Sequence, residues 1–163
     1  RSSAASHVYK RQGYVMLECA MTFDKTRSPG MLASEIARLY AAALQRALQP
    51  WGLSPGQFQA LSELWIEDGL TQRQLAARLG VEQPTMANTL GRMERDNLVA
   101  RKPHPEDGRS QQIWLTEAAR SLQLPASKAA LAADELMAAG LPPAERELFL
   151  SMLGRVASNL RNA

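Results

Sequence analysis

Residues 71–116 constrain the fold most, because turn-forming residues stand at fixed places between short apolar patterns. This segment reads TQRQLAARLGVEQPTMANTLGRMERDNLVARKPHPEDGRSQQIWLT. A Thr-x-x-Gln capping box predicts a short helix at its start, and Gly80 supplies the left-handed residue that a tight interhelical turn needs. A second helix is expected over residues 82–97, followed by strands at 98–101 and 111–115. This order predicts a helix-turn-helix with a β-hairpin wing.

The second of these helices carries two different faces. Met86, Leu90 and Met93 recur at spacings of four and three residues, so they are expected to face the core. The opposite face holds residues suited to reading base edges in a DNA major groove, namely Gln83, Thr85, Asn88, Thr89 and Arg92. Asn and Gln pair with adenine, Arg pairs with guanine, and the Thr methyl group meets the thymine methyl group. A merely solvated helix side is the alternative, but the turn before the helix and the wing after it favour DNA reading.

The loop between the two strands, residues 102–110, is longer than an ordinary hairpin turn, is stiffened by two prolines and bends at Gly108. A guanidinium at Arg109 on such a loop suits the negative potential of a narrow minor groove. The alternative is an exposed ion pair between Arg109 and Asp107, which would contribute only ~0–1 kcal/mol. His104 on the same loop is a candidate phosphate donor, with a spectator role as the equal alternative.

Helical spacing of apolar residues also predicts helices on both sides of the winged segment. One is expected over residues 31–49, and the next opens with a capping box at Ser54. A long helix is expected over residues 116–139 with a kink at Pro125. Gly and Pro residues at 140–143 then separate it from a last amphipathic helix.

The length of 163 residues favours one domain with a sizeable core, expected over residues 29–163. Residues 1–28 show neither a helical nor a strand period and lack the continuous apolar stretch of a signal peptide. We expect them to form a flexible N-terminal arm, which can include residues added for expression. No apolar run approaches the roughly 18 residues of a membrane span, so no membrane partner is expected.

The chain holds 19 Lys and Arg against 16 Asp and Glu, a net charge of +3. Residues 71–110 contain seven of these bases and five of the acids, a surplus too small to prove nucleic-acid binding by itself.

The single cysteine, Cys19, excludes an internal disulfide and indicates a reducing, cytoplasmic setting. The only histidines, His7 and His104, belong to no cluster of ligands, so neither a metal nor another cofactor is expected. An enzyme is not expected either, because the sequence offers no His base for a cysteine nucleophile, no Gly-rich phosphate loop and no paired carboxylates.

The winged segment resembles that of the MarR (multiple antibiotic resistance regulator) family. The likeness lies in a combination of motifs, which are the LAARLG turn, the PT of the recognition helix, the LVAR strand, the PEDGR wing and the LTEAAR restart. It extends in architecture from about Met31 to the C-terminus. Two residues depart from the pattern, because Glu82 stands where a capping Ser or Asp is common and Gly108 where a base is common.

The resemblance implies a mainly α (α+β) fold, with a winged helix-turn-helix over about residues 54–116 and dimerisation helices at about 31–49 and 117–162. It implies a homodimeric, sequence-specific transcriptional regulator, a repressor, that binds double-stranded DNA. In such proteins the arginine matched by Arg109 enters the minor groove, the acid matched by Asp107 holds it, and the strand arginine matched by Arg101 supports that acid. Together with phosphate contacts at Arg73 and His104, the expected DNA-binding set is Arg73, Gln83, Pro84, Thr85, Asn88, Thr89, Arg92, Arg101, His104, Asp107, Arg109 and Ser110.

Four aromatic residues suggest where an effector would bind. Tyr40, Trp51, Phe58 and Trp65 are expected to line an apolar pocket between the pairing helices and the winged lobe, although ordinary core packing is the simpler interpretation of any single one. A small apolar or aromatic anionic effector bound there would relieve repression. Two alternatives stay open, a winged-helix module that binds protein instead of DNA, and a redox sensor that uses Cys19.

Overall fold

The computed structural model describes residues 24–107 and 109–162, so His7, Cys19 and Gly108 lie outside the described residues. The chain divides into two units, one that ends at Ala37 and one that begins at Arg38. The described part of the first unit holds a turn and the beginning of helix α1 (Pro29–Leu48). The expected arm of residues 1–28 therefore lies mostly outside the described chain, and the expected division at residue 29 stays a prediction.

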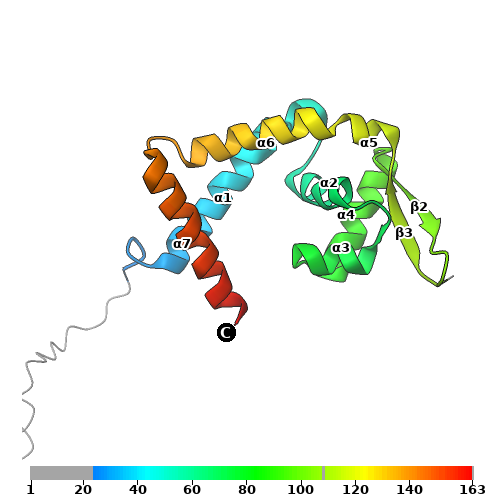
Figure 1. Cartoon of the computed structure of the whole chain (residues 1–163), viewed down its shortest axis with the longest axis horizontal. Helices are drawn as coiled ribbons and strands as arrows, with labels where there is room; N and C mark the ends of the chain where they lie inside the picture. The colour runs from blue at the N-terminus through cyan, green and yellow to red at the C-terminus, as the bar shows by residue number, and fades with distance from the viewer. Residues whose placement is uncertain (1–23, 108, 163) are drawn as a thin grey trace, which may run out of the picture. The chain divides into compact units, whose positions relative to one another are not determined.

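The second unit holds the rest of α1 and all later elements, most of which Figure 1 labels. In chain order these are the 3-10 turn η2 (Gln49–Trp51), α2 (Pro55–Ile66), β1 (Leu70–Thr71), α3 (Gln72–Leu79), α4 (Gln83–Arg95), β2 (Val99–Pro103), β3 (Gln111–Leu115), α5 (Glu117–Ser121), α6 (Gln123–Met137) and α7 (Pro143–Arg161). The predicted mainly α fold, with a helix-turn-helix followed by a hairpin, is confirmed.

Side-chain caps fix where α2 and α3 begin. The Ser54 hydroxyl accepts from the backbone N–H of Gln57, and the Gln57 side chain accepts from the Ser54 N–H at 2.9 Å, so the predicted capping box is confirmed. Thr71 and Gln74 repeat the same pair of bonds at the start of α3. Gly80 ends α3 with φ of +63°, the left-handed conformation that the sequence predicted for the turn into α4.

The core of the second unit packs the inner face of α4 against α2 and α3. Met86, Leu90 and Met93 are all buried, as their spacing predicted. Burying each such side chain contributes roughly 1.5–3 kcal/mol. The largest fully buried side chains are Leu48, Leu53, Leu61, Leu64, Leu70, Leu75, Leu90, Met93 and Ile113. This packing holds α4 by one face and leaves its other face outward.

The wing belongs to a three-stranded antiparallel sheet with the order β1-β3-β2. Strand β2 pairs with β3 as far as Pro103, which lies opposite Gln111, two residues past the predicted strand end at Arg101. The wing loop is therefore shortened to residues 104–110. The two-residue strand β1 was not predicted, because it is too short to show a period of two.

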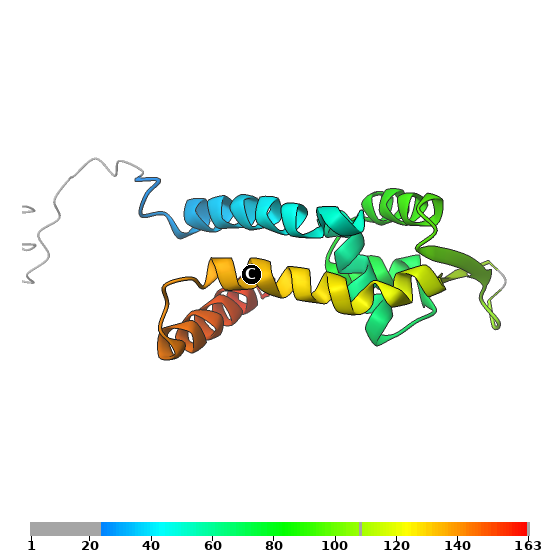
Figure 2. The same cartoon turned by 90° about the horizontal axis from the view of Figure 1, so that it is seen from above.

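The predicted helix over residues 116–139 is interrupted. Helix α5 ends at Ser121, Leu122 separates the two helices, and Pro125 lies in the first turn of α6. Proline has no N–H, and its ring clashes with the carbonyl four residues earlier, here that of Ser121. The break therefore falls one turn before Pro125, not at it as predicted, and α6 continues in roughly the direction of α5 (Figure 2).

The last helix, α7, exposes its apolar side chains. None of its 19 residues, all of them within the described chain, is buried. Its exposed large apolar residues are Leu148, Leu150, Met152, Leu153, Val156 and Leu160. Most helical stability in proteins comes from the packing of an apolar face, so this helix presents a face that residues 24–107 and 109–162 do not bury.

Candidate nucleic-acid interface

The outward face of α4 carries the predicted base-reading residues. Of these, Gln83, Pro84, Thr85, Asn88 and Arg92 are exposed and Thr89 is half-buried. The Thr89 hydroxyl donates to the Thr85 carbonyl at 3.0 Å, which engages its proton within the helix. The six residues thus lie on the exposed part of a helix whose opposite side is held in the core.

The first turn of α4 is anchored from the neighbouring helix and not by a cap. Among the described residues, no side chain caps this turn at Glu82, in line with the departure seen in the sequence. The side-chain amide of Gln72, the first residue of α3, donates to Oε1 of Gln83 at 3.2 Å. Sequence reasoning missed Gln72, because nothing in a local pattern indicates a bond between two helices. The bond leaves the Gln83 amide nitrogen as a donor for another group.

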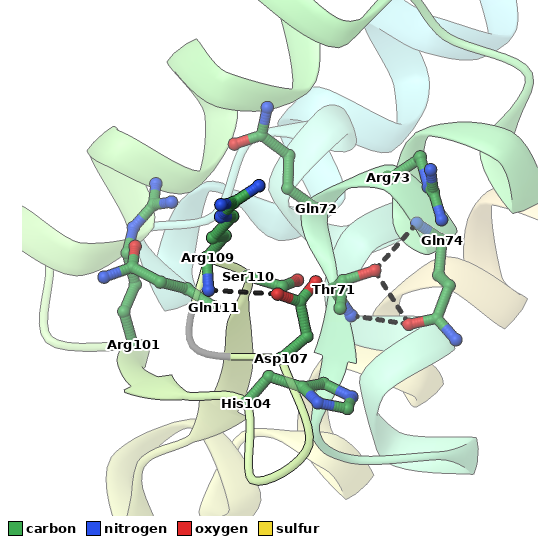
Figure 3. Close-up of a pocket in the computed structure, with 10 residues that line it drawn as sticks. All are labelled: Thr71, Gln72, Arg73, Gln74, Arg101, His104, Asp107, Arg109, Ser110 and Gln111. Carbon is green, nitrogen blue, oxygen red and sulfur yellow. Dashed lines mark hydrogen bonds between the residues drawn. The ribbon is translucent and has the colours of Figure 1, made fainter.

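A hollow of about 560 Å³ lies between the start of α3 and the wing. Figure 3 shows the residues that line it, which are Thr71, Gln72, Arg73, Gln74, Arg101, His104, Asp107, Arg109, Ser110 and Gln111. Three of them carry a guanidinium and one a carboxylate, so the lining is basic. The structure therefore brings Arg73, Arg101, His104, Asp107, Arg109 and Ser110 together here, and places the other six predicted residues on α4.

Hydrogen bonds within the wing loop fix its shape. One oxygen of Asp107 accepts from the backbone N–H of Arg109 at 3.0 Å, and the backbone carbonyl of Asp107 accepts from the N–H of Ser110 at 2.9 Å. The loop is closed where the N–H of His104 donates to the Ser110 carbonyl at 3.0 Å. Asp107 therefore holds the backbone of the loop. Figure 3 shows the Arg109 side chain extending away from that carboxylate, and no ion pair joins the two described side chains.

Arg101 has a different partner from the one that the resemblance implied. Its Nε donates to the Glu94 carboxylate of α4 at 2.9 Å, and not to Asp107 of the wing. The reason is positional, because β2 runs directly after α4 and brings Arg101 beside the last turns of that helix. The pair joins the recognition helix to the wing strand, so Arg101 acts within the protein as a support for both.

The other arginines of the winged segment differ in how their charge is balanced. Arg78 pairs with Glu67, the residue after α2, and at 3.6 Å with Glu63 of α2, so these two carboxylates neutralise it. Within the described chain, four of them have no ion-pair partner, namely Arg73, Arg92, Arg95 and Arg109. These four exposed cations lie on α3, α4 and the wing, the elements of the helix-turn-helix and its loop.

The four aromatic residues suggested for an effector pocket have separate surroundings. Phe58 and Trp65 meet edge to face with ring centroids 6.0 Å apart, and the Trp65 indole donates to a backbone carbonyl of α5 at 3.1 Å. Trp51 is exposed. The Tyr40 hydroxyl donates to Asp134 at 2.7 Å, and burial, together with this carboxylate, raises the pKa of Tyr40 to about 12. Packing accounts for Phe58 and Trp65, and the effector pocket stays a prediction.

The described part of the chain lacks two classes of feature. No helix there is long and apolar enough to cross a membrane. Over residues 24–107 and 109–162, no group of three or more His, Cys, Asp or Glu side chains could hold a metal ion. His7 and Cys19, and with Cys19 the redox alternative, lie outside the described residues.

Comparison with known proteins identifies this arrangement. The family model of MarR matches residues 51–110, which cover α2, the helix-turn-helix and the wing loop. A probable transcriptional regulator from Pseudomonas aeruginosa is 26% identical and superposes with a TM-score of 0.77, over 82% of this chain and 99% of that one. Its winged-helix segment matches the MarR family, and its fold is that of MarR-family regulators. The chain is a DNA-binding transcriptional regulator with a winged helix.

Two structures of another regulator resemble this chain closely in fold. The transcriptional repressor CouR, bound to a 23-mer DNA duplex, is 26% identical, with a TM-score of 0.75 over 81% of this chain and 94% of that one. CouR from Rhodococcus jostii RHA1, bound to p-coumaroyl-CoA, is 24% identical, with a TM-score of 0.72 over 83% and 96% of the two chains. The relatives that match by family and by fold are transcriptional regulators and not enzymes.

Proposed function

We propose that this protein is a homodimeric repressor that binds a pseudo-palindromic operator and is released by a small effector. The observation that carries the proposal is the exposed polar face of α4 beside the basic hollow formed by α3 and the wing. In this proposal α4 reads base edges in the major groove. Arg109 enters the adjacent minor groove, and Arg73 contacts a phosphate, which positions the protein without specifying sequence.

The exposed apolar side chains support a partner that is a second copy of this chain. Helix α7 buries none of its residues, and α6 exposes Leu131 and Leu136. Exposed apolar side chains gathered along a helix mark interaction sites in soluble proteins. Two copies joined through these helices would offer two recognition helices to half-sites about 34 Å apart, which is one turn of DNA.

The effector is proposed to be a small apolar or aromatic anion that binds near Tyr40, Trp51, Phe58 and Trp65. Support comes from CouR, a repressor with the same fold that has been solved both on DNA and with p-coumaroyl-CoA. An effector releases DNA only if it binds one arrangement of the dimer better than the other. Linkage then requires that operator DNA weaken effector binding by the same factor.

Selection of bound sequences from a random DNA pool tests the function most directly. A palindromic sequence enriched from the pool would establish DNA binding, the symmetry of the bound protein and the spacing of the half-sites together. On that operator, Arg109→Ala should weaken binding by about 1–3 kcal/mol in a mobility-shift titration. Lys128→Ala is the matched control, since it removes an exposed cation from α6, away from the wing. Equal affinity of Arg109→Ala and the unaltered protein would refute the wing contact.

A salt titration separates DNA binding from the alternative of a protein-binding winged helix. Affinity for DNA should fall linearly in the logarithm of salt concentration, because contacts to phosphates release counterions. A pool that yields no preferred sequence, together with a flat salt dependence, would favour a protein partner. Analytical ultracentrifugation tests the dimer, and a monomer at micromolar concentration would contradict it.

A further inference from the structure

At the end of β3, where β1 no longer pairs with it, a side chain accepts the backbone hydrogen bond that a strand would otherwise accept. Strand β1 pairs Leu70 with Ile113, and the N–H of Gly69 still donates to the Ile113 carbonyl at 3.0 Å. At Gly69 the backbone takes a φ of +78° and leaves the sheet. One oxygen of Asp68 then accepts from the N–H of Leu115 at 2.9 Å. The Asp68 carboxylate thus takes the hydrogen bond that a longer β1 would have made to the end of β3.

The same carboxylate also holds helix α5. Its first oxygen accepts a second bond, from the N–H of Gly69 at 3.0 Å, and its other oxygen accepts from the guanidinium of Arg120. The Asp68 side chain is only 16% exposed, although its partner Arg120 is 48% exposed. Hydrogen bonds to an ionised group are roughly twice as strong as neutral ones. A single half-buried carboxylate therefore binds the end of β3 and α5 at once.

We propose that Asp68 is a positioning residue, which sets the place of the wing relative to α5 and thereby the contact of Arg109 with DNA. Strand β3 leads back to the wing loop that carries Arg109, and α5 leads on to α6 and the apolar helices proposed to join two copies. Thr116 joins β3 to α5 along the chain, and Asp68 adds a second connection that fixes the angle between them. This inference rests on the proposed function, since it gives the wing its role on DNA.

Other bonds keep the fold when this link is removed. The Thr116 hydroxyl, at the start of α5, donates to the carbonyl of Asn97 at 2.7 Å, and the Trp65 indole donates to the carbonyl of Ala119. Helix α5 therefore stays attached to the core without Asp68. Replacement of Asp68 should loosen the wing without unfolding the protein, which makes the proposal testable by binding.

A double-mutant cycle with Arg109 tests the proposal on the selected operator. In the unaltered protein, Arg109→Ala should cost about 5- to 150-fold in affinity. In the Asp68→Ala background, where no side-chain oxygen is left to accept from the N–H of Leu115, the same change should cost less than about 3-fold. A role of Asp68 in stability alone would leave the Arg109 factor unchanged, because distant independent sites are additive. An equal factor in both backgrounds overturns the proposal.

A second background and a control sharpen the cycle. Arg120→Gln removes the partner on α5 and leaves every bond of Asp68 to the backbone, so it too should reduce the Arg109 factor. Arg78→Gln breaks an ion pair of the same kind between α3 and α2, and the full factor should persist there. A full factor in the Arg120→Gln protein contradicts the link to α5. If Arg109→Ala costs nothing in the unaltered protein, the proposed wing contact fails first, and this inference fails with it.

Discussion

Gly69 stands where the backbone leaves the sheet, and we predict that it tolerates no side chain. Its φ is +78°, and an added Cβ would lie 2.7 Å from Cζ2 of Trp114 and 3.0 Å from Cε2. The left-handed conformation costs a residue other than glycine roughly 1–2 kcal/mol. Displacing a packed indole adds roughly 1–3 kcal/mol. Gly69→Ala should therefore lower the free energy of unfolding by about 2–5 kcal/mol.

Gly80 provides the matched control for this prediction. Its φ is +63°, yet no described atom lies within 4 Å of its added Cβ. Gly80→Ala should cost only the backbone part, about 1–2 kcal/mol, so the difference between the two variants isolates the clash with Trp114. Urea unfolding should be compared at equal protein concentration, because self-association shifts apparent stability. In thermal unfolding, each kcal/mol corresponds to roughly 2–4 °C for a chain of this size.

A third variant decides whether the indole is the cause. In a protein that already carries Trp114→Val, Gly69→Ala should cost only the backbone part, about 1–2 kcal/mol, since the clashing ring atoms are gone. The reasoning is refuted if Gly69→Ala destabilises no more than Gly80→Ala, or if its cost is the same with and without the indole.

Two further predictions concern single hydrogen bonds. Gln72→Ala removes the bond that holds the Gln83 amide, so it should weaken operator binding by roughly 0.5–1.5 kcal/mol. It should also relax the preference for the base that faces Gln83. Titration of operators changed one base pair at a time measures both effects, and an unchanged base preference would contradict the prediction. The second prediction concerns Tyr40, whose pKa lies at about 12, above its ordinary value of 10, so the folded state favours the neutral phenol. The free energy of unfolding gained in this way is present below about pH 10 and is lost as the pH rises toward about 12. Tyr40→Phe should flatten part of that fall in urea unfolding measured at about pH 9 and about pH 11.5, and an equally steep fall in both proteins would argue against it.

Local chemistry explains which parts of the fold could be predicted from the sequence. Both capping boxes, at Ser54 and at Thr71, were predictable because their bonds join residues only three apart. Gly80 was predictable for the same reason, since a left-handed residue between two helices has few alternatives. Periodicity also identified the buried face of α4. In each case the information lies within one or two turns of the chain.

Bonds between distant segments explain what the sequence did not reveal. Strand β1 exists because β3, some forty residues later, offers it a partner, and the Asp68 carboxylate bonds to Leu115 for the same reason. The contact between Gln72 and Gln83 and the pairing of Arg101 with Glu94 likewise depend on how helices and strands meet. The roles of the twelve DNA-binding residues stay predictions, although their grouping on α4 and around the hollow accords with them.

The first turn of α4 has a consequence for how the protein meets DNA. Glu82 gives this turn no side-chain acceptor, and Pro84 removes one donor, so the backbone N–H groups of Gln83 and Thr85 are left for a partner from outside the chain. The N-terminus of a helix favours phosphate oxygens, through both its free donors and its dipole. We therefore expect a backbone phosphate of the duplex to accept hydrogen bonds from these N–H groups. The first turn of the recognition helix would then become ordered in the same step in which the protein binds DNA.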